Sequence, residues 1–213
     1  MGGAIPGPWG VKHRIFATVS AVLLAVLLAG CAGTPPPGRA CLAALARHDI
    51  DYQPVEVDDP RDPRCVVDTA VRVRRIEAAL NHPATMSCGL ADRFDEFERE
   101  IVQPAARSEF SEHVSRIDHF GAYACRANTS MRGRFSEHAF GRAIDIAGFR
   151  LADGTKISVE HDWSKSGPKQ RFLYRVAQGA CRYFSVVLTP DSNADHYNHF
   201  HLDIGPGKVC GVR

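Results

Sequence analysis

Residues 143–151, Ala-Ile-Asp-Ile-Ala-Gly-Phe-Arg-Leu, alternate in a way that predicts a β-strand with two different faces. Ile144 and Ile146 point to one side, where we expect them to fill a core. Asp145 points to the other side, between two alanines. This segment therefore predicts a sheet that buries its isoleucines and presents a carboxylate on the opposite face.

Further strands are predicted on both sides of this segment in the sequence. Residues 156–161 follow it across Asp153-Gly154, a dipeptide that is a strong hairpin signal. Residues 184–189 and 199–204 form a second strand pair joined by a polar loop. We expect both pairs to be antiparallel and to form one small sheet.

Three helices are predicted from apolar residues that recur at helical spacing, over residues 66–80, 90–106 and 168–181. We expect Pro104 to bend or close the second helix. Pro168 is favourable as the first residue of the third. Strands and helices together predict an α+β fold: a small antiparallel sheet that is flanked by helices on one side.

Potential metal ligands gather on or beside the predicted strands. His138 and Asp145 are close in sequence, and His199 and His201 are two residues apart on one strand, so that their side chains share a face with Asp203. Two histidines and one carboxylate bind zinc well and leave a coordination position open for hydrolysis. The remaining histidine is placed to handle protons. The pattern predicts a hydrolytic zinc site.

Small and polar residues around these groups support the same hypothesis. Gly141 and Ala143 are expected to keep bulk out of the space between His138 and Asp145. Ser136 and Asp203 are expected to support the ligands from behind. His196 has two interpretations: it supports the site in the same way, or it simply belongs to the loop. The other histidines considered, His48, His82, His113, His119 and His161, are assigned to the surface or the core.

The N-terminus predicts an exported precursor. Lys12 and Arg14 precede an apolar run over residues 15–28 that is too short for a comfortable membrane span. The run ends in Leu28-Ala29-Gly30-Cys31, which resembles a bacterial lipobox, although a plain secretory signal is the alternative. Acylated Cys31 would tether the protein to a membrane without spanning it.

The domain organisation follows from this signal. Residues 1–30 are predicted to be the lipoprotein signal peptide, residues 31–39 the lipidated cysteine and a proline-rich linker, and residues 40–213 one domain. Ala32 directly after the cysteine suggests an outer-membrane anchor that faces the periplasm. The net charge of +2 and the mixing of basic with acidic residues argue against a nucleic-acid partner.

Six cysteines remain after Cys31, and an even number in an exported chain favours three disulfides. We predict the pairs Cys41–Cys65, Cys88–Cys125 and Cys181–Cys210. Only the last has a geometric basis: Cys181 precedes one strand of an antiparallel pair and Cys210 follows the other, so both lie at the same end. A cysteine enzyme is disfavoured because no cysteine lies beside a histidine in the sequence.

The motif Ser136-x-His138-x-x-Gly141-x-Ala143-x-Asp145, followed by His199-x-His201, resembles the zinc peptidases of the LAS superfamily. That group includes D-alanyl-D-alanine carboxypeptidases, dipeptidases and cell-wall endopeptidases. More closely, residues 88–205 resemble the bacterial extensin-like C-terminal domain, an exported relative of that group. The stretches that carry this likeness are residues 123–126, 136–149 and 196–203.

The LAS resemblance implies a role for each residue of the motif. It implies that His138, Asp145 and His201 hold zinc and that His199 acts as a base or stabilises the transition state. Arg126, which follows a tyrosine as in related peptidases, is implied to contact the substrate and steady the oxyanion.

The expected function is zinc-dependent hydrolysis of peptidoglycan peptides in the bacterial envelope, at an amide that involves a D-amino acid, with D,D- or L,D-specificity. The first alternative is a lipoprotein that binds peptidoglycan in the same groove without cutting it, as an anchor or regulator. The second is an envelope scaffold in which the His and Asp side chains are ordinary packing groups.

Overall fold

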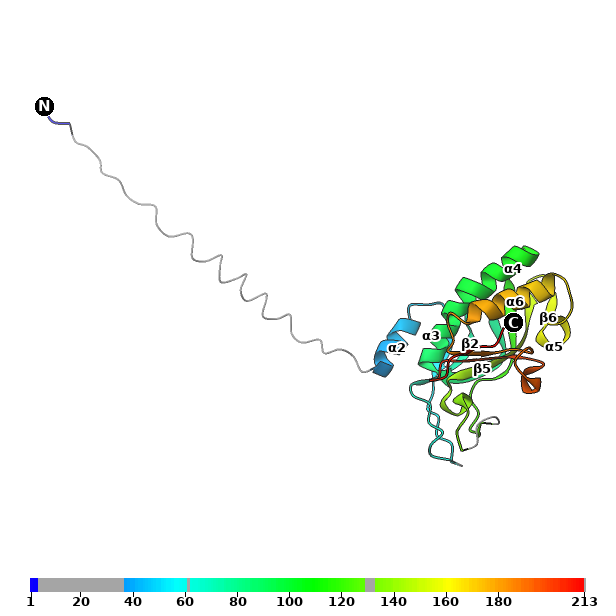
Figure 1. Ribbon diagram of the computed structural model, residues 1–213. Coiled ribbons are helices and arrows are strands. Elements are labelled where there is room, and N and C mark those ends of the chain that lie inside the picture. Colours follow the sequence, from blue (N-terminus) through cyan, green and yellow to red (C-terminus); the bar gives the residue numbers. More distant parts are fainter. Residues whose placement is uncertain (4–36, 61, 129–132, 213) are drawn as a thin grey trace. The chain divides into compact units, whose positions relative to one another are not determined.

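The computed structural model describes residues 1–3, 37–60, 62–128 and 133–212 (Figure 1). The predicted signal peptide, Cys31 and most of the predicted linker lie outside the described residues. Helix α2 (Pro37–Leu45) begins within the last residues of that linker, with a proline at its first position, where a missing N–H is tolerated. No helix in the described part of the chain is long and apolar enough to cross a membrane.

Nine strands in the described ranges form one sheet. They are β1 (Asp51–Pro54), β2 (Ala70–Arg75), β3 (Ala79–Ser87), β4 (Val114–Gly121), β5 (Ala143–Leu151), β6 (Lys156–Ser158), β7 (Val186–Leu188), β8 (Phe200–Asp203) and β9 (Val209–Cys210). The order is β1-β2-β3-β4-β5-β8-β7-β9, and β6 pairs with the end of β5. The β3–β4 and β7–β9 pairs are parallel and the others antiparallel. The α+β class is confirmed, with a larger and mixed sheet.

The helices gather against one face of the sheet (Figure 1). They are α3 (Cys88–Phe97), the π-helical turn η1 (Glu98–Val102), α4 (Gln103–Phe110), α5 (Val159–Asp162) and α6 (Pro168–Ala180). Ile144 and Ile146 of β5 are fully buried in this core, as their spacing predicts. Phe149 of β5 packs edge-on against Phe172 of α6, with ring centroids 5.1 Å apart. The carboxylate face of β5 is thereby left to the opposite side.

The prediction of a helix over residues 66–80 is wrong. Most of it forms β2 and the start of β3. Val71 and Val73 are fully buried. The arginines that follow each of them, Arg72 and Arg74, are exposed. This alternation is the two-residue period of a strand. Arg74 reaches across to Asp51 of β1, with a 3.0 Å ion pair. The alternation of valine and arginine in the sequence is the pattern that favours a strand here.

The helix predicted over residues 90–106 exists but does not end at Pro104. The π-helical turn η1 interrupts the α-helical hydrogen bonding just before the proline, which then lies in the first turn of α4. A proline in a first turn removes no intrahelical hydrogen bond, and the rod continues to Phe110. The helix predicted over 168–181 is confirmed as α6.

The hairpin predictions hold with one change. β5 and β6 are antiparallel across Asp153-Gly154, where Gly154 has a φ of +88°. β6 ends earlier than expected because the Ser158 side chain accepts a hydrogen bond from the His161 N–H and starts α5. β7 and β8 are antiparallel as predicted.

Three disulfides form among the residues that the structure describes, but two of the three predicted pairings are wrong. Cys41 pairs with Cys88, because α2 lies against the start of α3, and Cys65 pairs with Cys125. The predicted Cys41–Cys65 and Cys88–Cys125 bridges therefore do not exist. The Cys181–Cys210 bridge is present, at the shared end of β7 and β8. The fold brings helix α2 to the start of α3, and the segment around Cys65 to the segment around Cys125, and neither contact has a local signal in the sequence.

A buried carboxylate joins η1 to the sheet. Glu98 is fully buried, and its two oxygens accept hydrogen bonds from the backbone N–H groups of Glu77 and Ala78 at 2.9 and 2.8 Å. Gln103 donates to Glu98 at 2.9 Å and also bonds both backbone groups of Val114, at 2.9 and 3.0 Å. These two side chains hold the turn between β2 and β3 and the start of β4.

We expect Glu98→Gln to lower the free energy of unfolding by about 2 kcal/mol, because either orientation of the amide points an NH₂ group at a donor. Urea denaturation followed by circular dichroism measures this. Glu160→Gln, at an exposed position of α5, is the matched control and should change little. Equal stability of Glu98→Gln and the wild type would contradict the role given to this carboxylate.

The same residue predicts a pH dependence. Burial raises the pKa of Glu98 to about 7, from a usual 4.5, although the hydrogen bonds from Gln103 and Ala78 oppose the rise. Since the folded chain holds this proton more tightly than the unfolded chain, the contribution of Glu98 to stability falls as the pH rises from 4.5 to about 7. The difference in unfolding free energy between the wild type and Glu98→Gln should shrink over this range.

Candidate metal centre

His138 reaches the site from a 3-10 helix, η2 (Glu137–Phe140), that lies just before β5. Gly141 ends this helix with a φ of +60°, in the left-handed region that favours glycine. A Cβ on Gly141 would lie 2.9 Å from the backbone nitrogen of Ser87, and the Gly141 carbonyl accepts a 2.8 Å hydrogen bond from that same nitrogen. The expectation that Gly141 leaves room for the metal is therefore wrong: this glycine lets η2 approach the end of β3.

Asp145 and His201 are brought together by the pairing of β5 with β8. The two residues are directly opposite each other in the antiparallel register, and Ala143 is opposite Asp203. Opposed residues share a face of the sheet, so the two side chains point to the same side. Ile144 and Leu202, the pair between them, are fully buried on the helix-covered side.

Three side chains converge at this point. His138 Nε2 lies 3.2 Å from Asp145 Oδ1 and 3.2 Å from His201 Nδ1. His201 Nδ1 lies 2.9 Å from Asp145 Oδ1. Ligand atoms of all three residues fall within 4.8 Å of one another, and among the described residues this is the group of histidine and carboxylate side chains close enough to hold a metal ion.

Both histidines are anchored through their outer nitrogens. His138 Nδ1 lies 2.7 Å from the carbonyl oxygen of Ala122, which fixes the proton on Nδ1 and leaves Nε2 to face the site. His201 Nε2 lies 3.1 Å from Asp203 Oδ2, and the Gly205 N–H donates to the other oxygen of that carboxylate at 2.8 Å. Imidazoles backed by a carbonyl and a carboxylate are typical of zinc sites, so the donor set fits the metal.

The charges of the site depend on one another. Burial raises the pKa of the Asp145 carboxyl, but the hydrogen bonds from His138 and His201 outweigh it and hold the pKa well below its usual range. Burial lowers the pKa of His201, and the hydrogen bonds to Asp145 and Asp203 reverse this and raise it to about 9. The site without metal thus holds a proton on His201, which a bound cation would displace.

His199 lies just before β8 and beside the three converging residues. Its Nε2 is 3.6 Å from Asp145 Oδ1, and its Nδ1 lies 2.8 Å from the side-chain oxygen of Asn198. This contact places a proton on Nδ1 and leaves Nε2 able to accept one. Burial lowers the pKa of His199, and the charge of Asp145 offsets this only in part. His199 is therefore neutral at pH 7 and suited to a general base.

The structure also places His196 and Ser136, the two other residues predicted to support the site. His196 lies in the 3-10 helix η3 (Ala194–His196), where its Nδ1 is 2.7 Å from Asn193 Oδ1 and its ring centroid is 5.1 Å from that of His199. Burial lowers the pKa of His196 to about 4, so it is neutral. Ser136 is the buried residue at the start of η2, and its side chain makes no capping hydrogen bond there.

The site opens into a cleft with a volume of about 800 Å³. Arg126 lines it together with Asp145, His199 and His201. The backbone carbonyl of Arg126 accepts a 3.1 Å hydrogen bond from the N–H of Ser136, which ties the arginine segment to the start of η2. The structure therefore brings Arg126 to the same cleft as the three converging residues.

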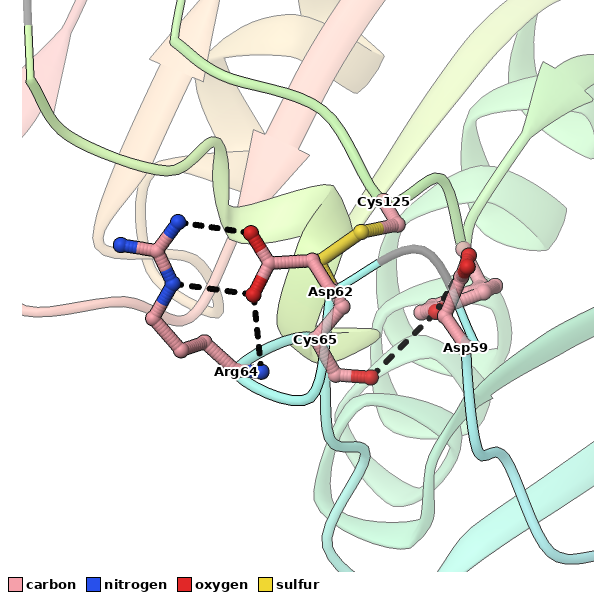
Figure 2. Close-up of a disulfide and its surroundings, with 6 residues drawn as sticks. Asp59, Asp62, Arg64, Cys65 and Cys125 are labelled. Atoms are coloured by element: carbon pink, nitrogen blue, oxygen red, sulfur yellow. Dashed lines mark hydrogen bonds and ion pairs between the residues drawn. A yellow bond between two sulfur atoms is a disulfide. The ribbon is translucent and has the colours of Figure 1, made fainter.

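A disulfide supports this arginine segment from behind. Cys125, the residue before Arg126, is bridged to Cys65 (Figure 2). Beside the bridge, Asp62 accepts hydrogen bonds from Arg64 at 2.9 and 2.6 Å. The Arg64 guanidinium also stacks over the ring of Phe135, 4.6 Å from its centroid, and Phe135 lines the cleft. The loop around Cys65 thus supports one wall of the cleft.

Sequence reasoning missed the groups that orient the site. Asn198 precedes His199 directly and could have been found as a hydrogen-bonding neighbour. The Ala122 carbonyl carries no side-chain signal, because any residue supplies one. The five histidines assigned elsewhere stay outside the metal group; His119, for example, is buried with Nε2 2.9 Å from the carbonyl oxygen of His82.

Comparison with known proteins gives one match. The family model described as extensin-like protein C-terminus matches residues 39–211. The match spans η2, β5 and β8, and so it includes every residue of the candidate centre. No curated protein and no solved structure matches the chain.

We expect Asp203→Asn to lower the pKa of His201 by at least about 1, because it removes one of the two carboxylates that stabilise the charged ring. The measurement is an NMR titration of the histidine rings after treatment with a chelator. Asp51→Asn, in the exposed β1 at the far edge of the sheet, is the matched control. An unchanged His201 titration would show that Asp203 does not act on this ring.

Proposed function

The chain belongs to the family of extensin-like protein C-terminal domains, and we propose that it is a zinc-dependent peptidase that cleaves peptidoglycan peptides in the bacterial cell envelope. The proposal includes a distant relation to the LAS zinc peptidases, whose motif matches residues 136–145 and 199–201. The single observation that carries it is the convergence of His138, Asp145 and His201 on one point, where Asp145 and His201 line a cleft.

The donor set favours zinc. His138 Nε2, His201 Nδ1 and the Asp145 carboxylate would be its ligands, since two imidazole nitrogens and one carboxylate leave a coordination position open. Zinc held by these residues would supply Lewis-acid chemistry and would lower the pKa of water in the open position to about 7. The anchoring of both rings by Ala122 and Asp203 reduces the reorganisation that binding requires.

The protein's own residues handle the proton and the developing charge. His199 Nε2 accepts the proton of the attacking water and delivers it to the amine that leaves, a role typical of histidine near pH 7. Its hydrogen bond to Asn198 holds the ring in the required tautomer. Arg126 places a positive charge in the cleft, where it stabilises the negative charge that develops on the carbonyl oxygen under attack.

The cleft and the disulfides support the proposal of a cell-wall peptide as the substrate. A volume of about 800 Å³ accommodates several residues of a peptide, which suits an amide within or next to the D-amino acids of the stem, with D,D- or L,D-specificity. Three disulfides are typical of an exported protein. With acylation of Cys31, the protein would be held at the outer membrane and face the periplasm.

We expect the full chain, exported so that its disulfides form and purified in detergent, to hold about one zinc ion per chain. His201→Ala should lose most of it, because one of three ligands is gone. Metal analysis by mass spectrometry measures this, with His161→Ala, an exposed histidine of α5, as the control. A wild-type protein without zinc would contradict the proposed zinc site. It would favour the scaffold alternative, in which these side chains are packing groups.

His199→Ala should retain zinc and lower the rate of peptidoglycan hydrolysis by about 10²–10⁴-fold, because only proton transfer is lost. Purified peptidoglycan is incubated with each variant, and released fragments are separated by chromatography, which also identifies the bond that is cut. Undiminished hydrolysis by His199→Ala would refute its assignment as the base. Zinc-loaded wild type that releases no fragment would favour the peptidoglycan-binding alternative.

A further inference from the structure

The cleft face of the sheet continues past the candidate metal ligands as a row of aliphatic side chains. In the β7–β8 register, Leu188 is opposite His201 and Val186 is opposite Asp203. Val186 is in turn paired with Val209 of β9. Register partners present their side chains on one face, and these three aliphatic residues all line the cleft. We call Val186, Leu188 and Val209 the aliphatic strip.

The aliphatic strip is not part of the core. Val187, between Val186 and Leu188, is fully buried on the helix-covered side, as strand alternation requires. Val186 and Leu188 are half-buried, and Val209 is 49% exposed. Apolar side chains that face a cleft beside a reactive centre, and not the core, mark a surface for an apolar ligand group.

The strip is held rigidly in place. The Cys181–Cys210 disulfide fixes β9 next to the end of α6. The Val209 N–H donates to the Ser185 carbonyl at 2.9 Å. A Cβ on Gly207 would lie 2.7 Å from a methyl group of Val186, so glycine allows the chain to close over that side chain. A surface fixed in this way binds without a cost for ordering it.

The spacing between the aliphatic strip and the candidate metal centre matches the residue spacing of an extended peptide. Neighbouring strands lie about 4.8 Å apart, so Leu188 is about one strand spacing from His201, and Val209 is about two spacings from Asp203. An extended peptide advances about 3.3 Å per residue. The strip therefore meets side chains about one to three residues from an amide held at the candidate metal centre.

We propose that the aliphatic strip is a specificity subsite that receives a short aliphatic side chain of the substrate, such as the methyl group of alanine, close to the scissile amide. This rests on the proposed peptidase function and adds the substrate feature that the cleft selects. It also gives the C-terminal β9 segment and its disulfide a role in substrate recognition.

The test compares two peptides that differ only in the methyl groups concerned, N-acetyl-L-Lys-D-Ala-D-Ala and N-acetyl-L-Lys-Gly-Gly. Their dissociation constants are measured by calorimetry with the zinc-loaded full chain in the His199→Ala background, so that neither peptide is consumed. Turnover of both peptides is followed in parallel with His199 intact. The variant Val186→Thr/Val209→Thr replaces two methyl groups by hydroxyl groups of similar size, and Val66→Thr, at a valine that is 56% exposed, is the control.

We expect the alanine peptide to bind at least about fourfold more tightly than the glycine peptide, the factor for one buried methyl group. The double threonine variant should lose this preference while its affinity for the glycine peptide changes less than about twofold. Val66→Thr should keep the preference.

Three results would overturn the subsite: no preference in the wild type, a preference that survives the double substitution, or no binding of either peptide. A preference without turnover of either peptide, together with no release of fragments from peptidoglycan, would support the strip and refute the peptidase. Turnover without a preference would support the peptidase and refute the strip. The two proposals thus fail separately.

Discussion

The pairing of β5 with β8 is the constraint on which the rest of the structure depends. It places Asp145 opposite His201 on one face and Ile144 opposite Leu202 on the other. The buried pair fixes the register, because a slip by one residue would move the two isoleucines of β5 to solvent and the carboxylate into the core. The geometry of the candidate centre is therefore held by the same hydrophobic burial that stabilises the domain.

The third side chain of the centre comes from outside the sheet, so its position needs separate support. His138 is fixed by the carbonyl of Ala122, and η2 is fixed by the close approach of Gly141 to Ser87. The walls of the cleft are supported in the same manner. One disulfide holds the loop beside Arg126 and another holds β9 beside Val186. Support of this kind from separate parts of the fold suits a site in which three side chains converge.

Local patterns predicted much of the fold, and they failed where two patterns competed. The alternation over residues 143–151 and the hairpin at Asp153-Gly154 were sufficient for β5 and β6, and helical spacing was sufficient for α6. Residues 66–80 were misassigned because apolar residues that recur by chance at helical spacing hid the alternation of valine and arginine in β2. The strand pairing of β2 with β1 and β3 then prevailed over the weak helical preference.

The sequence by itself determined the chemistry: the types and spacing of His138, Asp145 and His201 place nitrogen and oxygen donors on the elements that carry them. Strand alternation is local, so the face on which Asp145 lies follows from residues 143–151 alone. Only the tertiary structure decided how four of the six bridged cysteines pair, which carbonyl orients His138 and which side chains line the cleft. Those are contacts between segments far apart in the chain, and they leave no local pattern in the sequence from which they could be predicted.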